Sequence, residues 1–132
     1  MASITKEIVI SVPAEIAWEM IRDFGGVQRI VPGFLLDCRL DGDARIVTFA
    51  NGTGARELLV DCDEARRRLV YAAVSERVKH YNASVQVESD GETRSRLVWI
   101  VDLLPNEIAP YIDAQMDQAA LSMQKNLRHD IV

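Results

Sequence analysis

Residues 106–128, NEIAPYIDAQMDQAALSMQKNLR, decide the fold, because they form the one long stretch of the chain with a helical pattern of apolar side chains. These side chains recur at spacings of three and four residues, which places them on one side of a helix. They are Ala109, Ile112, Met116, Ala119, Ala120, Met123 and Leu127. The pattern predicts an amphipathic helix from Asn106 to about Arg128 that lies on a sheet.

The middle of this apolar side carries small residues, namely Ala119, Ala120 and the nearby Ser122. Met116 and Met123 flank them, and methionine side chains adapt to irregular surroundings. Two interpretations fit this composition. Either there is room for a ligand beneath the helix, or the helix packs closely against a tightly curved sheet.

Strand patterns dominate the rest of the chain. Ser3 to Val12 alternates with one interruption at Lys6, and a short helical stretch begins at Pro13. Six strand-like segments follow, at Phe34–Leu40, Ala44–Ala50, Ala55–Cys62, Leu69–Val74, Tyr81–Glu88 and Arg94–Leu103. Because their connections are short, we expect an antiparallel meander. The chain is therefore predicted to be an α+β protein whose curved sheet and one long helix leave an internal cavity between them.

Composition limits the class of function. A chain of 132 residues is long enough for one folded domain, and we predict a single domain over residues 1–132. The formal charge of −5 lacks the basic surface that phosphate binding requires, so a nucleic-acid partner is not expected. The basic run Arg66-Arg67-Arg68 is interpreted as a solvated turn.

Other classes of site find no support in the sequence. His80 and His129 have no neighbours at metal-ligand spacing, so neither a metal nor another cofactor is expected. Cys38 and Cys62 are expected to be reduced thiols. No apolar run approaches the ~20 residues of a membrane span, and the N-terminus does not resemble a signal peptide. These patterns favour a cytoplasmic protein without stable membrane insertion.

Several motifs, in a particular order, resemble one known family. They are VPAEIAWEMIRDF at 12–24, Gly42-x-x-Arg45, Gly54-x-x-Glu57-x-Leu59 followed by Asp63, then Tyr71, Tyr81, and Trp99 with Pro105. In this order and spacing the chain resembles the START-like, or helix-grip, superfamily, which includes polyketide cyclases, birch-pollen-type allergens and plant hormone receptors. The resemblance covers nearly the whole chain.

The resemblance implies a helix-grip fold of the order β-α-α-β6-α, in which the sheet wraps around the C-terminal helix and a ligand lies between them. It places the ligand-binding positions at Arg45, Glu57, Tyr71, Tyr81, Trp99, Met116, Ala120 and Met123. It also implies that the loops 50–54 and 75–79 border the mouth of the pocket.

The direction of Glu57 is the first open question. If Glu57 points inward, hairpin geometry places it opposite Tyr71 and diagonal to Arg45. The apolar alternation of Leu58 and Val60 favours the opposite register, whereas the resemblance favours an inward Glu57. With Glu57 inward, Leu58 and Val60 are exposed, which favours a homodimer. The remaining alternative is a surface ion pair between Arg45 and Glu57.

Trp99 presents a similar question. A two-residue turn at Asp90-Gly91 pairs Tyr81 with Ile100, whereas a three-residue turn with a bulge pairs Tyr81 with Trp99. Only the second arrangement brings both aromatic side chains into the cleft. Plain core packing is the alternative role for each of them.

Three functions follow from these observations. The first is binding of a hydrophobic or amphipathic small molecule, such as a lipid, a polyketide or an aromatic metabolite, in the cavity. The second is an enzyme of the polyketide cyclase or dehydratase type, with Glu57 as acid or base. The third is a protein-interaction module of the same fold that uses Leu58 and Val60. The chain has no nucleophile–base pair or nucleotide loop, so the enzyme hypothesis is limited to proton transfer and positioning.

Overall fold

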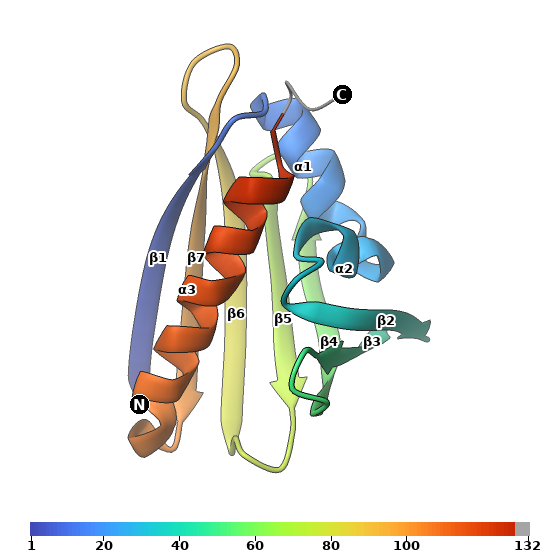
Figure 1. Cartoon of the computed structure of the whole chain (residues 1–132), viewed down its shortest axis with the longest axis vertical. Coiled ribbons are helices and arrows are strands. Elements are labelled where there is room, and N and C mark those ends of the chain that lie inside the picture. Colours follow the sequence, from blue (N-terminus) through green and yellow to red (C-terminus); the bar gives the residue numbers. More distant parts are fainter. Residues whose placement is uncertain (129–132) are drawn as a thin grey trace.

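A computed structural model describes residues 1–128, which form a seven-stranded antiparallel sheet with a long helix along its concave side (Figure 1). The strands are β1 (Ala2–Ile10), β2 (Leu35–Asp41), β3 (Ala44–Phe49), β4 (Gly54–Asp63), β5 (Arg68–Val74), β6 (His80–Ser89) and β7 (Ser95–Leu104). The helices are α1 (Ala14–Arg22), α2 (Val27–Ile30) and α3 (Ala109–Asn126), with 3-10 turns at Phe24–Gly26 and Asn106–Ile108. The α+β class and the order β-α-α-β6-α are confirmed.

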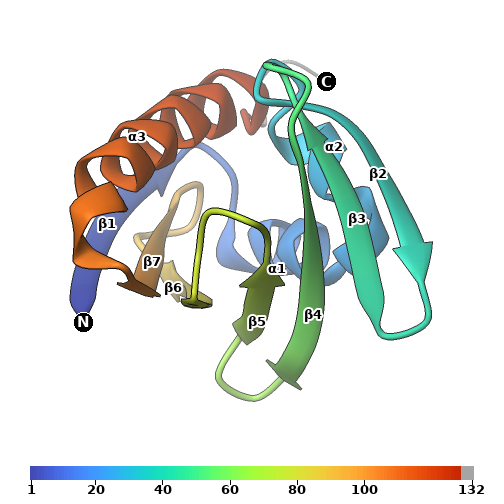
Figure 2. The same ribbon diagram turned by 90° about the horizontal axis from the view of Figure 1, so that it is seen from below.

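The strand order in the sheet is β1-β7-β6-β5-β4-β3-β2. Strands β2 to β7 therefore form a meander, and β1 pairs with the last strand of that meander. Helices α1 and α2 connect β1 to the opposite edge, at β2. Figure 2 shows the sheet curving so that β2, β3 and β4 turn around toward the side on which α3 lies. This curvature separates α3 from the β3–β4 part of the sheet.

Local sequence explains where the elements begin and turn. Pro13 precedes the first turn of α1, where a proline's missing N–H costs nothing. Gly42, at the β2–β3 turn, and Gly91, after β6, have φ angles of +63° and +95°, which glycine adopts without a steric penalty. The ends of all seven strands lie within two residues of the predicted ones.

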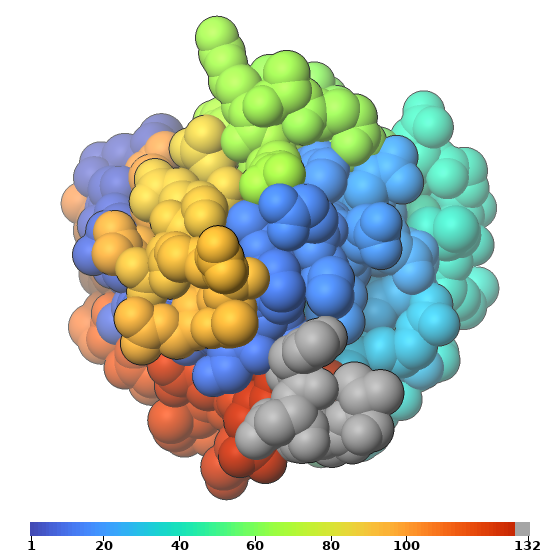
Figure 3. Space-filling view, turned by 90° about the horizontal axis from the view of Figure 1, so that it is seen from above, coloured from blue at the N-terminus to red at the C-terminus, as the bar shows by residue number. Residues whose placement is uncertain are grey.

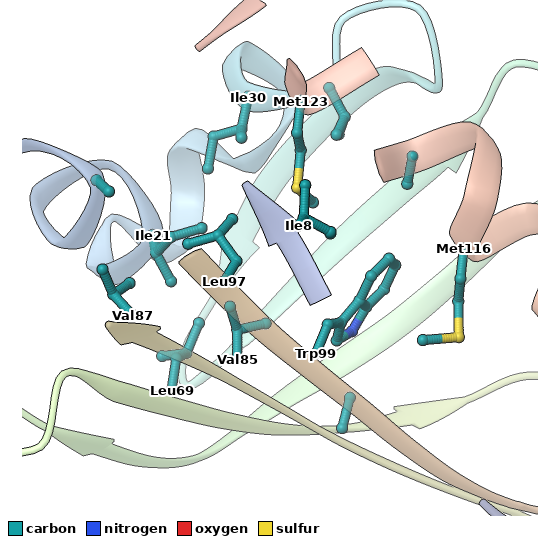
Figure 4. Packing of buried hydrophobic residues seen from close by; sticks show 14 of the residues in the cluster. Ile8, Ile21, Ile30, Leu69, Val85, Val87, Leu97, Trp99, Met116 and Met123 are labelled. Atoms are coloured by element: carbon teal, nitrogen blue, oxygen red, sulfur yellow. The ribbon is translucent and has the colours of Figure 1, made fainter. Parts of the chain in front are cut away.

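The core lies where β1, β6 and β7 meet α1 and α3. Ile8 pairs with Leu97 across β1 and β7, and both are buried (Figure 4). Lys6, the polar interruption in β1, contacts α3 instead: its Nζ lies 2.6 Å from Asp113 and 2.9 Å from Asp117. Lys6, the residue that interrupts the alternating pattern of β1, thus forms a contact between the sheet and α3.

One end of the molecule is closed by α1. Figure 3 views this end and shows α1 between the β4–β5 turn and the β6–β7 turn. Trp18 of α1 contributes to this closure, since its indole Nε1 donates a hydrogen bond of 2.7 Å to Glu64 in the β4–β5 turn. The loops that border a cavity therefore lie at the other end, near the start of α3.

Candidate ligand-binding site

A cavity of about 660 Å³ lies between the curved sheet and α3. Its volume falls within the range of ligand pockets, roughly 300–1,000 Å³. Apolar side chains from every layer of the fold form its walls, including Ile21, Ile30, Val47, Leu69, Val85 and Met123. In Figure 4, the side chain of Met116 on α3 extends toward Trp99 of β7. The space that the small residues of the helix suggested is therefore present.

Arg45 and Glu57 form a buried ion pair in the cavity wall. They lie directly opposite each other on β3 and β4, not diagonally as expected, and Arg45 Nε donates to Glu57 Oε1 at 2.7 Å. The two residues are only 4% and 9% exposed. The inward register of Glu57 is therefore correct, and a surface ion pair is excluded. The predicted partner of Glu57 on β5 is wrong, because Glu57 lies opposite Ala73 rather than Tyr71.

Two aromatic rings enclose the guanidinium group of Arg45. Its Cζ lies 4.1 Å from the ring centre of Phe24 and 4.9 Å from that of Tyr71. Its Nη1 donates a hydrogen bond of 3.1 Å to the carbonyl oxygen of Phe24. Such stacking and hydrogen bonding replace the hydration that a buried guanidinium loses. Arg45 is thus fixed in position and neutralised by Glu57.

Tyr71 and Tyr81 place two phenols beside this ion pair. Burial raises the pKa of Tyr71 well above its usual value, and the negative charge of Glu57 raises it further. The pKa of Tyr81 is also raised, first by burial and then by the neighbouring Tyr71. Arg45 opposes both pKa shifts without cancelling them. Both phenols are therefore uncharged at neutral pH and can donate hydrogen bonds.

Trp99 also belongs to the cavity wall, but neither predicted pairing is found. Trp99 pairs with Val85, and Tyr81 pairs with Leu103, because the connection between β6 and β7 comprises the five residues 90–94. Since the two positions still share one face of the sheet, both side chains line the cavity. Trp99 is 7% exposed, and its Nε1 has no hydrogen-bond partner of normal geometry within residues 1–128.

On α3, Met116 and Met123 line the cavity as the resemblance implied. The third predicted position is displaced by one residue: Ala119 lies on the cavity wall, whereas Ala120 is partly buried against the core. Each helical residue turns by about 100°, so the inward stripe 112, 116, 119, 123 leaves position 120 at its edge. The small side chain of Ala119 is what leaves space under α3.

The mouth of the cavity is bordered by both predicted loops. Thr53 and Gly54 line it on one side, and residues 75–78 line it on the other. Arg77 stacks over the ring of Tyr111 at the start of α3, at 5.0 Å from the ring centre. Sequence reasoning missed Tyr111, because its position between Pro110 and Ile112 gave no signal of a contact with a distant loop. It also missed Phe24, which lies in a short hinge rather than in a patterned element.

Within residues 1–128 no group of three or more His, Cys, Asp or Glu side chains could hold a metal ion. His129 lies outside the described residues. Cys38 and Cys62 are free thiols. In the same range, every helix is too short or too polar to cross a membrane.

Several solved structures share the fold of this chain. An uncharacterised protein from Bacillus thuringiensis has a TM-score of 0.85 at 18% identity, and the match covers 94% of this chain and 97% of that one. A START superfamily protein from Mycobacterium smegmatis has a TM-score of 0.79 at 10% identity, with coverages of 98% and 99%. The di-domain ARO/CYC protein BexL of the BE-7585A biosynthetic pathway has a TM-score of 0.81 at 13% identity, over 96% of this chain and 46% of that one.

Comparison with curated proteins gave no significant match. A family model, in contrast, matches residues 1–128, which is nearly the whole chain. The cavity between sheet and helix, the helix-grip fold and this match agree with one another. The chain belongs to the polyketide cyclase / dehydrase and lipid transport family.

Proposed function

We propose that this protein binds a hydrophobic or amphipathic small molecule in the cavity between the sheet and α3. The observation that carries the proposal is a cavity of about 660 Å³ with apolar walls and one buried polar cluster. Apolar walls favour the body of such a ligand, and a few fixed polar groups orient it. A lipid, a polyketide or an aromatic metabolite has this combination of a large apolar part and few polar groups.

The experiment is native mass spectrometry of the protein purified gently from its own cells, followed by extraction and identification of any released molecule. A cavity-filling variant makes the result specific. Ala119→Phe places a ring in the cavity, whereas Leu121→Phe adds the same ring at an exposed position of the same helix. We expect a bound apolar molecule in the wild type and in Leu121→Phe, and none in Ala119→Phe. Equal occupancy in all three proteins contradicts the proposal.

A second candidate function is catalysis of the cyclase or dehydratase type. The favouring observation is Glu57, a carboxylate buried in the cavity wall that uses only Oε1 in its contact with Arg45 Nε. Such a group can take a proton from a carbon next to a ligand carbonyl, while neighbouring donors hold the carbonyl oxygen. The fold shared with BexL agrees with this candidate.

Glu57→Gln distinguishes the first two candidates, because it removes the base and keeps the size of the side chain. A binding protein keeps its ligand with altered affinity, whereas an enzyme loses turnover of that ligand. The reaction is followed by mass spectrometry of a polyketide-type extract incubated with wild type and variant. Equal product formation by both proteins excludes Glu57 as the base.

A third candidate is a protein-interaction module that uses the outer face of β4, including a contact between two copies of this chain. The observation in its favour is that Leu58 and Val60 are exposed, Val60 by 57%. Val60→Glu places a charge on this face, and Val60 is not among the residues that line the cavity. Loss of a dimer or of a protein partner in this variant, with the small-molecule content unchanged, supports the third candidate.

A further inference from the structure

The polar cluster of the cavity carries no net charge. Arg45 and Glu57 neutralise each other at 2.7 Å, and their side chains are withdrawn from water. Tyr71 and Tyr81 are neutral phenols for the reasons given above. A carboxylate placed at this cluster brings a charge that no group of the cluster balances, unless it displaces Glu57 from Arg45; Arg56 and Arg77 line other parts of the cavity. Burying an unpaired charge is costly, so this cluster is suited to an uncharged group of a ligand.

Beside this cluster the cavity wall carries a further buried hydrogen-bond donor, the indole Nε1 of Trp99. Glu57 accepts from Arg45 Nε, and the carbonyl oxygen of Phe24 accepts from Arg45 Nη1. The phenols can each donate and accept. Trp99 can only donate, and its buried Nε1 is without a partner of normal geometry among the described residues. Its N–H lies beside the hydroxyl of Tyr71, which in turn lies beside that of Tyr81.

We infer that the cavity receives an uncharged ligand through a hydrogen-bond-accepting oxygen, such as that of an aryl ketone, at a donor set formed by Tyr71, Tyr81 and Trp99. The inference rests on the proposed ligand-binding function and names the ligand chemistry for it. The apolar walls hold the body of the ligand. The donor set selects a carbonyl or a similar acceptor over a hydrocarbon, and the neutralised ion pair selects it over a carboxylate.

Three probes of nearly equal shape test this selection: 2-acetylnaphthalene, 2-isopropylnaphthalene and 2-naphthoate. They share a naphthalene body and differ only in a ketone, a hydrocarbon or a carboxylate group. Tyr81→Phe removes one donor of the set. Ser122→Ala removes a hydroxyl outside the cavity walls and is the matched control. Dissociation constants are measured for each probe with each protein by calorimetry or fluorescence.

We expect Tyr81→Phe to weaken binding of the ketone roughly three- to tenfold, the usual effect of one lost hydrogen bond. Binding of the hydrocarbon should change less than about twofold, because it makes no such bond. For each probe the dissociation constant of the variant is divided by that of the wild type. The hydration of the free probe is the same in both measurements and cancels in this ratio. Ser122→Ala should leave both constants unchanged. In the wild type, 2-naphthoate should bind more weakly than the ketone.

The indole resonances give a second measurement. The chain has two tryptophans, so a nitrogen–proton spectrum shows two indole signals. Trp18 already donates to Glu64 at 2.7 Å and acts as the internal reference. The ketone should move the Trp99 proton downfield relative to the hydrocarbon, which has the same ring system, and should leave Trp18 unaffected.

The outcomes separate two kinds of failure. If the ketone and the hydrocarbon bind but respond equally to Tyr81→Phe, or if 2-naphthoate binds as tightly as the ketone, the inference is wrong and the ligand-binding function stands. If none of the three probes binds the wild type, the inference is wrong, and the ligand-binding function stands or falls with the mass spectrometry of the purified protein and its Ala119→Phe variant.

Discussion

Arg45 carries a positive charge inside the protein, and its surroundings replace the water that it loses. Glu57, the carbonyl oxygen of Phe24 and the rings of Phe24 and Tyr71 contact its guanidinium group. A buried pair of this kind contributes little net stability, but leaving one member unpaired is costly. The consequence can be measured by removing one residue at a time and then both.

Arg45→Met is expected to lower the free energy of unfolding by roughly 3–5 kcal/mol, because Glu57 then remains buried without a counter-charge. The double variant Arg45→Met, Glu57→Leu removes both charges and should regain most of this loss. Denaturant unfolding of the wild type, both single variants and the double variant gives the coupling between the two residues. If the loss in unfolding free energy of the double variant equals the sum of the losses of the two single variants, the burial of Glu57 does not depend on Arg45.

The two phenols predict how stability depends on pH. Folding raises the pKa of Tyr71 and Tyr81 above the ordinary phenol value of 10.0, so the folded protein favours the protonated form. The contribution of the two phenols to stability is therefore complete below the ordinary pKa of 10.0, and it is lost as the pH rises from there toward the raised pKa of the folded protein. Unfolding measured at about pH 8 and about pH 11 should show a larger loss of stability in the wild type than in the variant with Phe at both positions. Equal losses in the two proteins would show that these phenols ionise normally.

At the scale of elements, Lys6 connects β1 to α3. Its ammonium group reaches both Asp113 and Asp117, and the hydrogen bonds to these two carboxylates raise the pKa of Lys6. The aspartates are half-exposed, so the contact is partly screened by water. It nevertheless joins two elements that are far apart in the sequence.

Lys6→Met is expected to lower stability by about 1 kcal/mol or less, since exposed ion pairs are weak. The difference from the wild type should shrink at high salt, because salt screens such pairs. Denaturant unfolding at low and high ionic strength measures both effects. Arg94→Met removes an ion pair within a turn and is the control for a charge change that links no elements. If the loss of stability is the same at low and high salt, Lys6 stabilises the fold through packing of its methylene groups rather than through its charge.

Element boundaries could be predicted from sequence because each depends on local patterns, such as the alternation in Ser3–Val12 or the turn at Gly42. The pairing registers between neighbouring strands could not be predicted in this way. The predicted position of Glu57 opposite Tyr71 fails because β4 pairs with β5 in a register two residues away, in which Leu59 lies opposite Tyr71. The choice of Ala120 fails because the rotation of a helix about its axis depends on what it packs against. Pocket composition was thus predictable, whereas pairing within it required the three-dimensional structure.

At the scale of the whole molecule, the main core and the cavity adjoin each other and share β6, β7 and α3. The buried residues Ile8, Leu97 and Val101 fill the space between β1, β7 and α3. The cavity extends from β3, β4 and β5, where α3 stands away from the curved sheet, to Tyr81 of β6 and Trp99 of β7. α1 closes one end, and the loops around Thr53 and Arg77 border the other (Figure 1). Several side chains of the cavity wall, such as Leu69, Val85 and Met116, are thus also members of the core.

Filling the cavity should stabilise the whole molecule. A ligand that binds only the folded state raises the free energy of unfolding, by an amount that depends on its concentration relative to its dissociation constant. At one hundred times its dissociation constant, a ligand such as 2-acetylnaphthalene should add about 2.7 kcal/mol. For a chain of 132 residues this corresponds to a rise in Tm of roughly 10 °C. The rise should continue with the logarithm of ligand concentration beyond saturation, and differential scanning calorimetry measures it. Ala119→Phe should abolish the rise and Leu121→Phe should retain it, whereas the same rise in both variants would place the bound ligand outside the cavity.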